Sequence, residues 1–213
     1  MLTLRLVFHF EAALINVLLL WILTVPHEFA HAWAATRLGD DTPRLEGRVT
    51  LHPLAHVDWL GTVLLPFITS LVSGGFLGWG KPVNTNPFKL RGGVNGLAMV
   101  AVAGPASNVV FSVILALFAV LVARSFPAVA GIAAQAVALS IYLALFNLIP
   151  VPPLDGSKLL LLVRTPPAIY NELARGGFII IMVLIMATPL GRWMSMASFA
   201  ATDGIFRLLP FRF

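Results

Sequence analysis

The stretch Val25-Pro26-His27-Glu28-Phe29-Ala30-His31-Ala32 decides the fold, because it places metal-binding chemistry inside a long apolar segment. In a helix, two histidines four positions apart lie about 40° apart around the axis and about 6 Å apart along it, so both imidazoles reach one metal ion. The glutamate beside the first histidine then lies next to the metal without binding it, and accepts a proton from the attacking water. An H-E-x-x-H pattern on a helix is typical of zinc hydrolases.

The composition predicts a polytopic membrane protein. Of the 213 residues, 59% are hydrophobic and 11% are charged, whereas a soluble domain is about half apolar and a quarter charged. The formal charge of +5 would suggest nucleic-acid binding in a soluble chain. Here we expect no nucleic-acid partner, because basic residues at the ends of membrane spans set orientation. The absence of cysteine excludes disulfides and thiolate ligands, so His, Asp, Glu or amide groups must hold any metal.

The apolar segments predict an all-α fold with about four to six transmembrane helices in a single integral-membrane domain, residues 1–213. Its zinc-site core is expected at about 10–165 and its C-terminal helices at about 176–213. Several segments exceed the roughly 18 apolar residues that span a bilayer. The predicted spans are residues 10–36, 96–123, 128–149 and 178–191. Residues 192–213 are expected to be amphipathic or interfacial.

Two polar regions predict further features of the fold. Alternation of polar and apolar residues over 44–51 is strand-like, and residues 78–87 predict turns and a short extended piece, so we expect a small membrane-associated β-sheet. The apolar stretch 59–77 contains proline and glycine, so both a full span and a re-entrant segment fit its composition. The re-entrant path places most basic residues, in regions 37–95 and 155–177, on one side, which the positive-inside rule makes cytoplasmic, so we predict that residues 59–77 are re-entrant.

A catalytic zinc ion takes three protein ligands and a water molecule, so a third ligand must join the two histidines. The candidates are His52, His56, Asp58, Asp155 and Asp203. We favour Asp155, because it follows a span end, stands beside turn-forming proline and glycine, and balances the zinc charge. With a re-entrant 59–77 segment it also lies on the same side of the membrane as the end of the H-E-x-x-H span. An Asp-Gly turn without any metal is the alternative.

Three motifs together resemble the site-2 protease family of intramembrane metalloproteases. They are His27-Glu28-Phe29-Ala30-His31, then Gly104-Pro105-Ala106-Ser107-Asn108, then the segment from Asn147 to Gly156. The loop motifs at residues 47–51 and 80–84 are also similar to that family. The resemblance covers roughly residues 10–165, in the right order, and is that of a minimal form without a PDZ-like or CBS-like domain.

The resemblance implies one zinc ion per chain on His27, His31 and Asp155, with Glu28 as general base. It implies that Asn108 and Asn147 line the site and steady the oxyanion or the substrate backbone. By the same resemblance, Lys81-Pro82-Val83 would be an edge strand that pairs with unwound substrate. The implied substrate is a membrane-anchored protein cleaved in or near its transmembrane helix, during regulated intramembrane proteolysis. The implied location is the cell membrane, as in a bacterial inner membrane, with the site toward the cytoplasm.

Two other functions also fit part of the pattern. A membrane zinc transporter, or a zinc-binding membrane protein without proteolytic activity, would also use two histidines and an aspartate in a membrane. Such a protein has little need for Glu28, which stands beside the first histidine without binding the metal. Residue His52 stands before Pro53 where the family pattern leads us to expect an amide, so a regulatory or secondary metal role for it stays open.

Overall fold

A computed structural model of the chain describes residues 2–73 and 78–209. The chain divides into two compact units, residues 1–89 and 90–213. Residues 74–77 of the predicted re-entrant segment and residues 210–213 of the predicted C-terminal region lie outside the described residues. The single-domain organisation expected from the sequence stays a prediction.

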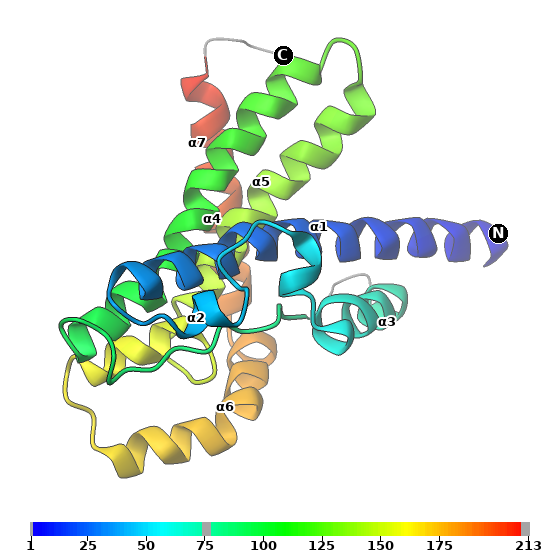
Figure 1. The fold of residues 1–213 in the computed structure, drawn as a ribbon. Helices are drawn as coiled ribbons and strands as arrows, with labels where there is room; N and C mark the ends of the chain where they lie inside the picture. The colour runs from blue at the N-terminus through cyan, green and yellow to red at the C-terminus, as the bar shows by residue number, and fades with distance from the viewer. Residues whose placement is uncertain (1, 74–77, 210–213) are drawn as a thin grey trace. The chain divides into compact units, whose positions relative to one another are not determined.

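The first unit is built on α1 (Leu2–Arg37), the blue helix of Figure 1. Its buried side chains recur every three or four positions, as they do on one face of a helix. They include Ala13, Val17, Leu20, Thr24, His27, His31 and Ala35. The two histidines therefore continue the face that begins with apolar side chains, and α1 carries them into the interior of the protein.

Short helices surround α1 in this unit. They are α2 (Thr42–Leu45), the 3₁₀-helix η1 (Pro53–His56), the π-helix η2 (Trp59–Leu64) and α3 (Leu65–Ser73). The side-chain amide of Asn16 donates to the hydroxyl of Ser70 at 3.2 Å, which joins α1 to α3. The apolar helical stretch Trp59–Val72 is shorter than the four helices able to cross a membrane. Its re-entrant path stays a prediction.

The described part of the second unit, residues 90–209, contains four long helices and one short one. They are α4 (Val94–Val122), α5 (Pro127–Asn147), the 3₁₀-helix η3 (Asp155–Leu161), α6 (Pro167–Ala187) and α7 (Leu190–Leu208). Helices α4 and α5 lie side by side (Figure 1). A buried cluster of Ala116, Val137 and Ile141 holds them together. The hydroxyl of Ser140 adds a hydrogen bond to the carbonyl of Asn108 at 2.8 Å.

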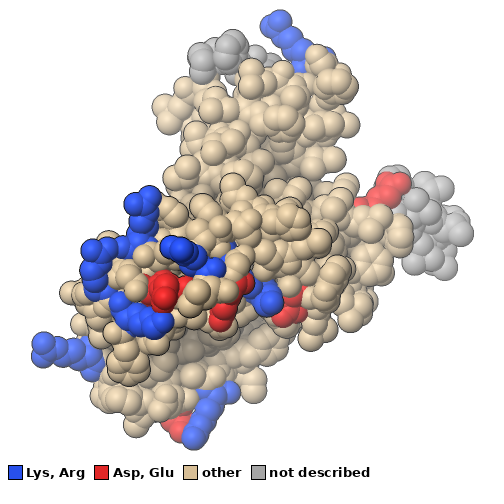
Figure 2. Space-filling model, viewed as in Figure 1, with Lys and Arg blue, Asp and Glu red and all other residues tan. Residues whose placement is uncertain are grey.

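Within the described residues, four helices are long and apolar enough to cross a membrane: residues 10–37 of α1, and α4, α5 and α6. Figure 2 shows wide areas without a charged side chain on the face it displays. These helices match the four predicted spans, except that α6 begins at Pro167 rather than near 178. Residues 167–177, which precede the predicted span, are helical as well, because Pro167 starts the helix. Its charged residues Glu172 and Arg175 form an exposed pair on its surface.

The predicted β-sheet is wrong, because no strand occurs in residues 2–73 or 78–209. Residues 44–51 do not form a strand, since Pro43 lies in the first turn of α2 and Gly47 turns the chain with a φ of +68°. Lys81-Pro82-Val83 is irregular backbone and not an edge strand. Its peptide groups bind to side chains and to the carbonyl of His56 instead of to a neighbouring strand.

Candidate active site

Helix α1 brings the two histidines of the H-E-x-x-H motif together. The Nε2 atoms of His27 and His31 lie 3.1 Å apart, and each residue is 6% exposed. Two nitrogen ligands of a tetrahedral zinc ion, each about 2.0–2.1 Å from the metal, are about 3.3 Å apart. The histidine pair therefore fits zinc without rearrangement of the helix.

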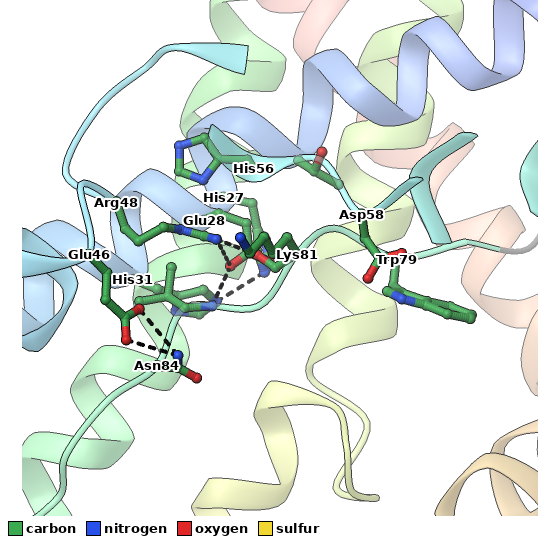
Figure 3. Close-up of polar contacts among 12 residues, drawn as sticks. His27, Glu28, His31, Glu46, Arg48, His56, Asp58, Trp79, Lys81 and Asn84 are labelled. Atoms are coloured by element: carbon green, nitrogen blue, oxygen red, sulfur yellow. Dashed lines mark hydrogen bonds and ion pairs between the residues drawn. The ribbon is translucent and has the colours of Figure 1, made fainter. Parts of the chain in front are cut away.

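Glu28 is buried beside the histidines and is held from outside the helix (Figure 3). Its Oε2 accepts a hydrogen bond from the backbone N–H of Val83 at 3.1 Å. The same oxygen lies 4.0 Å from a terminal guanidinium nitrogen of Arg48. These two contacts fix the orientation of the Glu28 side chain within the site.

Residues 79–86 form an extended segment across this site, here called the strap. Hydrogen bonds connect it to the rest of the first unit from one end to the other. Its anchors are Trp79 N–H to Gly61 C=O at 2.9 Å, Lys81 N–H to His56 C=O at 3.0 Å, Asn84 Nδ2 to Glu46 Oε1 at 3.0 Å and Asn86 N–H to Asp40 Oδ2 at 2.6 Å. Because a Cβ on Gly80 would lie 3.2 Å from Thr24, a glycine there lets the strap approach α1 closely.

Arg48 lies inside this arrangement rather than on the surface. It is 4% exposed, and a terminal nitrogen of its guanidinium donates to the carbonyl of Lys81. Burial lowers the pKa of Arg48, while the carboxylates of Glu28 and Glu46 act in the opposite direction. An arginine still carries its charge at neutral pH, because its ordinary pKa lies far above neutrality. In the sequence, Arg48 belongs to the loop motif at residues 47–51 and has no predicted role of its own.

The other candidates for a third metal ligand in the first unit are engaged elsewhere or exposed. His56 is fully buried, and its Nε2 lies 2.7 Å from the carbonyl of Thr50. One carboxylate oxygen of Asp58 caps η2 by accepting the N–H groups of Leu60 and Gly61. His52 is exposed on the loop before η1.

The remaining predicted site residues lie in the second unit. The Asp155 carboxylate, at the start of η3, lies 3.2 Å from Lys158 Nζ. Asn108 on α4 is 1% exposed, and no described residue lies within hydrogen-bond distance of its side-chain amide. Asn147 donates its side-chain N–H to the carbonyl of Leu143 at 2.9 Å. Asp203, the fifth candidate ligand, is exposed on α7 and pairs with Arg207.

Comparison with known proteins assigns the family. Residues 15–135, more than half of the chain, match Peptidase family M50. The chain belongs to this family. It is 34% identical to YwhC of Bacillus subtilis (strain 168) over 178 residues. This alignment covers 78% of this chain and 77% of that protein. It is 32% identical over 188 residues to Rip2 of Mycolicibacterium smegmatis, which covers 81% of this chain and 67% of that protein.

Both relatives carry zinc metalloprotease in their names. No solved structure gives a significant match. The family match confirms the resemblance to site-2 proteases, and together with the H-E-x-x-H helix it makes the chain a zinc-dependent peptidase. The assignment of individual residues within the site stays a prediction, as does the preference for Asp155 as third ligand.

Proposed function

We propose that this peptidase is an intramembrane endopeptidase that cleaves a peptide bond in or near a transmembrane helix of a membrane-anchored protein, in regulated intramembrane proteolysis. One observation carries the proposal. The H-E-x-x-H motif lies in the part of α1 that is long and apolar enough to cross a membrane. A hydrolytic site on such a helix meets substrates that are themselves in the bilayer.

Zinc would be held by His27, His31 and Asp155. Zinc, when bound, acts as a Lewis acid that polarises the scissile carbonyl and lowers the pKa of a water ligand to about 7. Asp155 is the proposed third ligand because a carboxylate balances the charge of the metal, and because His56 and Asp58 have other partners. An imidazole binds zinc in its neutral form.

Glu28 is the proposed general base. Its Oε2 is fixed by Val83 N–H, so the carboxylate is oriented before the substrate arrives. It takes a proton from the attacking water and passes it to the nitrogen of the leaving amine. Buried as it is, the carboxylate exchanges little with bulk water, which favours delivery of that proton to the leaving group.

Substrate binding is assigned to the strap and to two asparagines. A peptide bond inside an intact helix has its carbonyl already hydrogen-bonded, so the substrate helix must unwind locally, and its freed backbone groups need partners. Lys81, Pro82 and Val83 present extended backbone next to Glu28, where unwound substrate would lie. Asn108 and Asn147 would steady the oxyanion or the substrate backbone. The distribution of basic residues supports an orientation of this site toward the cytoplasm.

The test is cleavage of a model transmembrane substrate in liposomes, with zinc measured in the same preparations. For Glu28→Gln we expect activity to fall by about 10²–10⁴-fold, the range of general-base catalysis, with zinc still near one per chain. For Asp155→Ala we expect loss of both zinc and cleavage. Asp203→Ala is the matched control, since its carboxylate is exposed and paired on α7, and it should change neither.

Four results would contradict the proposal. Full zinc in Asp155→Ala would remove that residue from the ligand set and return attention to His52. Cleavage by Glu28→Gln at the wild-type rate would exclude Glu28 as the base. Cleavage of soluble peptides alone, with no transmembrane substrate cut, would limit the chain to a peptidase that does not act inside the membrane. Zinc transport by wild type without cleavage would favour the transporter.

A further inference from the structure

Arg48 joins the strap to the proposed general base in a closed ring of contacts. One terminal guanidinium nitrogen donates to the carbonyl of Lys81 and lies 4.0 Å from Oε2 of Glu28. Two residues after Lys81, the N–H of Val83 donates to that same Oε2. Between them stands Pro82, whose ring fixes φ and which has no N–H. The spacing between the two anchored peptide groups is therefore stiff.

Burial makes this ring more than a surface ion pair. Arg48 is 4% exposed and Glu28 is 8% exposed. Two long charged side chains at a surface contribute little, but in a water-poor site each fixes the other, and loss of one leaves the other uncompensated. The Nε of Arg48 has no hydrogen-bond partner among the described residues. A buried arginine kept with one donor unpaired is costly to stability, which points to a role beyond folding.

We infer that Arg48 is a positioning residue that sets the orientation of the Glu28 carboxylate relative to the strap. The inference rests on the proposed role of Glu28. The ring engages Oε2 through two partners, so proton transfer falls to Oε1. Arg48 also holds the carbonyl of Lys81, so the strap and the base keep one fixed geometry when a substrate lies on the strap. Its contacts are with Glu28 and Lys81, and it acts through these two residues.

Arginine suits this task better than lysine. Its planar guanidinium presents several donors in fixed directions, and one group can serve a carbonyl and a carboxylate together. A lysine ammonium is a compact charge on a flexible stem and would satisfy one of the two at a time. Arg48→Lys should therefore keep part of the effect, and Arg48→Gln should lose it.

The experiment compares the full-length protein in liposomes as wild type, Arg48→Lys, Arg48→Gln and Glu28→Gln. Arg44→Gln is the matched control, because Arg44 is exposed on α2, four positions before Arg48. We expect kcat to fall by about 10²-fold in Arg48→Gln, the cost of misplacing a catalytic group by about 1 Å. KM and zinc content should stay near wild type, Arg48→Lys should fall between the two, and Arg44→Gln should be unchanged.

Chemical rescue separates positioning from folding. In Arg48→Ala, added guanidinium ion should raise kcat, because it can occupy the emptied place beside Glu28. Urea, a neutral molecule of the same shape, should not, and Glu28→Gln should respond to neither. A wild-type kcat in Arg48→Gln, a fall in kcat that follows zinc loss, or equal rescue by urea would overturn the inference. An inactive wild type, or an active Glu28→Gln, would instead refute the proposed function.

Discussion

The first unit and the α4–α5 pair differ in the partners of their buried polar side chains. Around α1, charged side chains are buried with partners: Asp40 is fully buried and accepts the N–H groups of Thr42 and Asn86. Between α4 and α5, the cluster around Ala116 is apolar, and Asn108 is a buried amide whose side chain contacts no described hydrogen-bond partner. Polar substitutions should therefore be most costly in the first region, and changes of volume in the second.

Substitution of Asn108 has the largest expected effect and gives the strongest test of this comparison. In Asn108→Leu we expect kcat to fall by about 10²–10³-fold, the cost of removing one oxyanion donor. The thermal unfolding midpoint in detergent should stay the same or rise, because an unpaired amide is replaced by an apolar group of similar size. Ser112→Ala, at a buried hydroxyl bonded within α4, is the control. A lower midpoint with unchanged kcat would make Asn108 a packing residue.

Loss of the hydrogen bond between the strap and Glu28 has the next largest expected effect. Val83→Pro removes the only N–H that Val83 can donate, while keeping extended backbone. We expect kcat to fall by about 10²-fold, since Glu28 loses an orienting hydrogen bond, with zinc content unchanged. Val83→Ala keeps the N–H and should stay within a few-fold of wild type. Equal losses in both variants would assign the effect to the side chain and not to the hydrogen bond.

Volume, and not polarity, should control the second region. Ala116 is fully buried against Val137 and Ile141, so Ala116→Leu overfills the contact and should cost about 1–3 kcal/mol of unfolding free energy. Urea or thermal unfolding in detergent measures this difference. Ala128→Leu, at an exposed position of α5, should change stability little. Similar stability of the two variants would show that α4 and α5 can separate slightly at no cost.

Local patterns in the sequence account for the parts that were predicted correctly. Four long apolar runs and an i, i+4 pair of histidines predict spanning helices and a metal motif, because both signals depend on neighbours within one helix. The alternation over 44–51 wrongly predicted a strand, since the positive φ of Gly47 outweighs that pattern. The role of Arg48 depends on the strap, more than thirty positions later in the chain, and no local pattern shows that contact.

Substitution of His56 has the smallest expected effect, and it tests the first region through the pH dependence of its stability. Burial lowers its pKa below the usual value of about 6.5, aided by nearby Arg48 and opposed by its bond to Thr50 and by Glu28. On acidification the unfolded chain therefore binds this proton first. The stability that His56 contributes is complete above about pH 6.5 and is lost as pH falls toward the lowered pKa of the folded protein.

His56→Gln keeps a donor that can reach the Thr50 carbonyl and does not titrate. Unfolding midpoints in detergent, measured between about pH 5 and 8, should fall less steeply with acid in this variant than in wild type. His52→Gln removes an exposed histidine and should follow the wild-type curve. If His56→Gln kept the wild-type slope, the acid sensitivity would belong to other groups. A shallower slope would show that the burial of His56 accounts for part of the acid sensitivity of the first region.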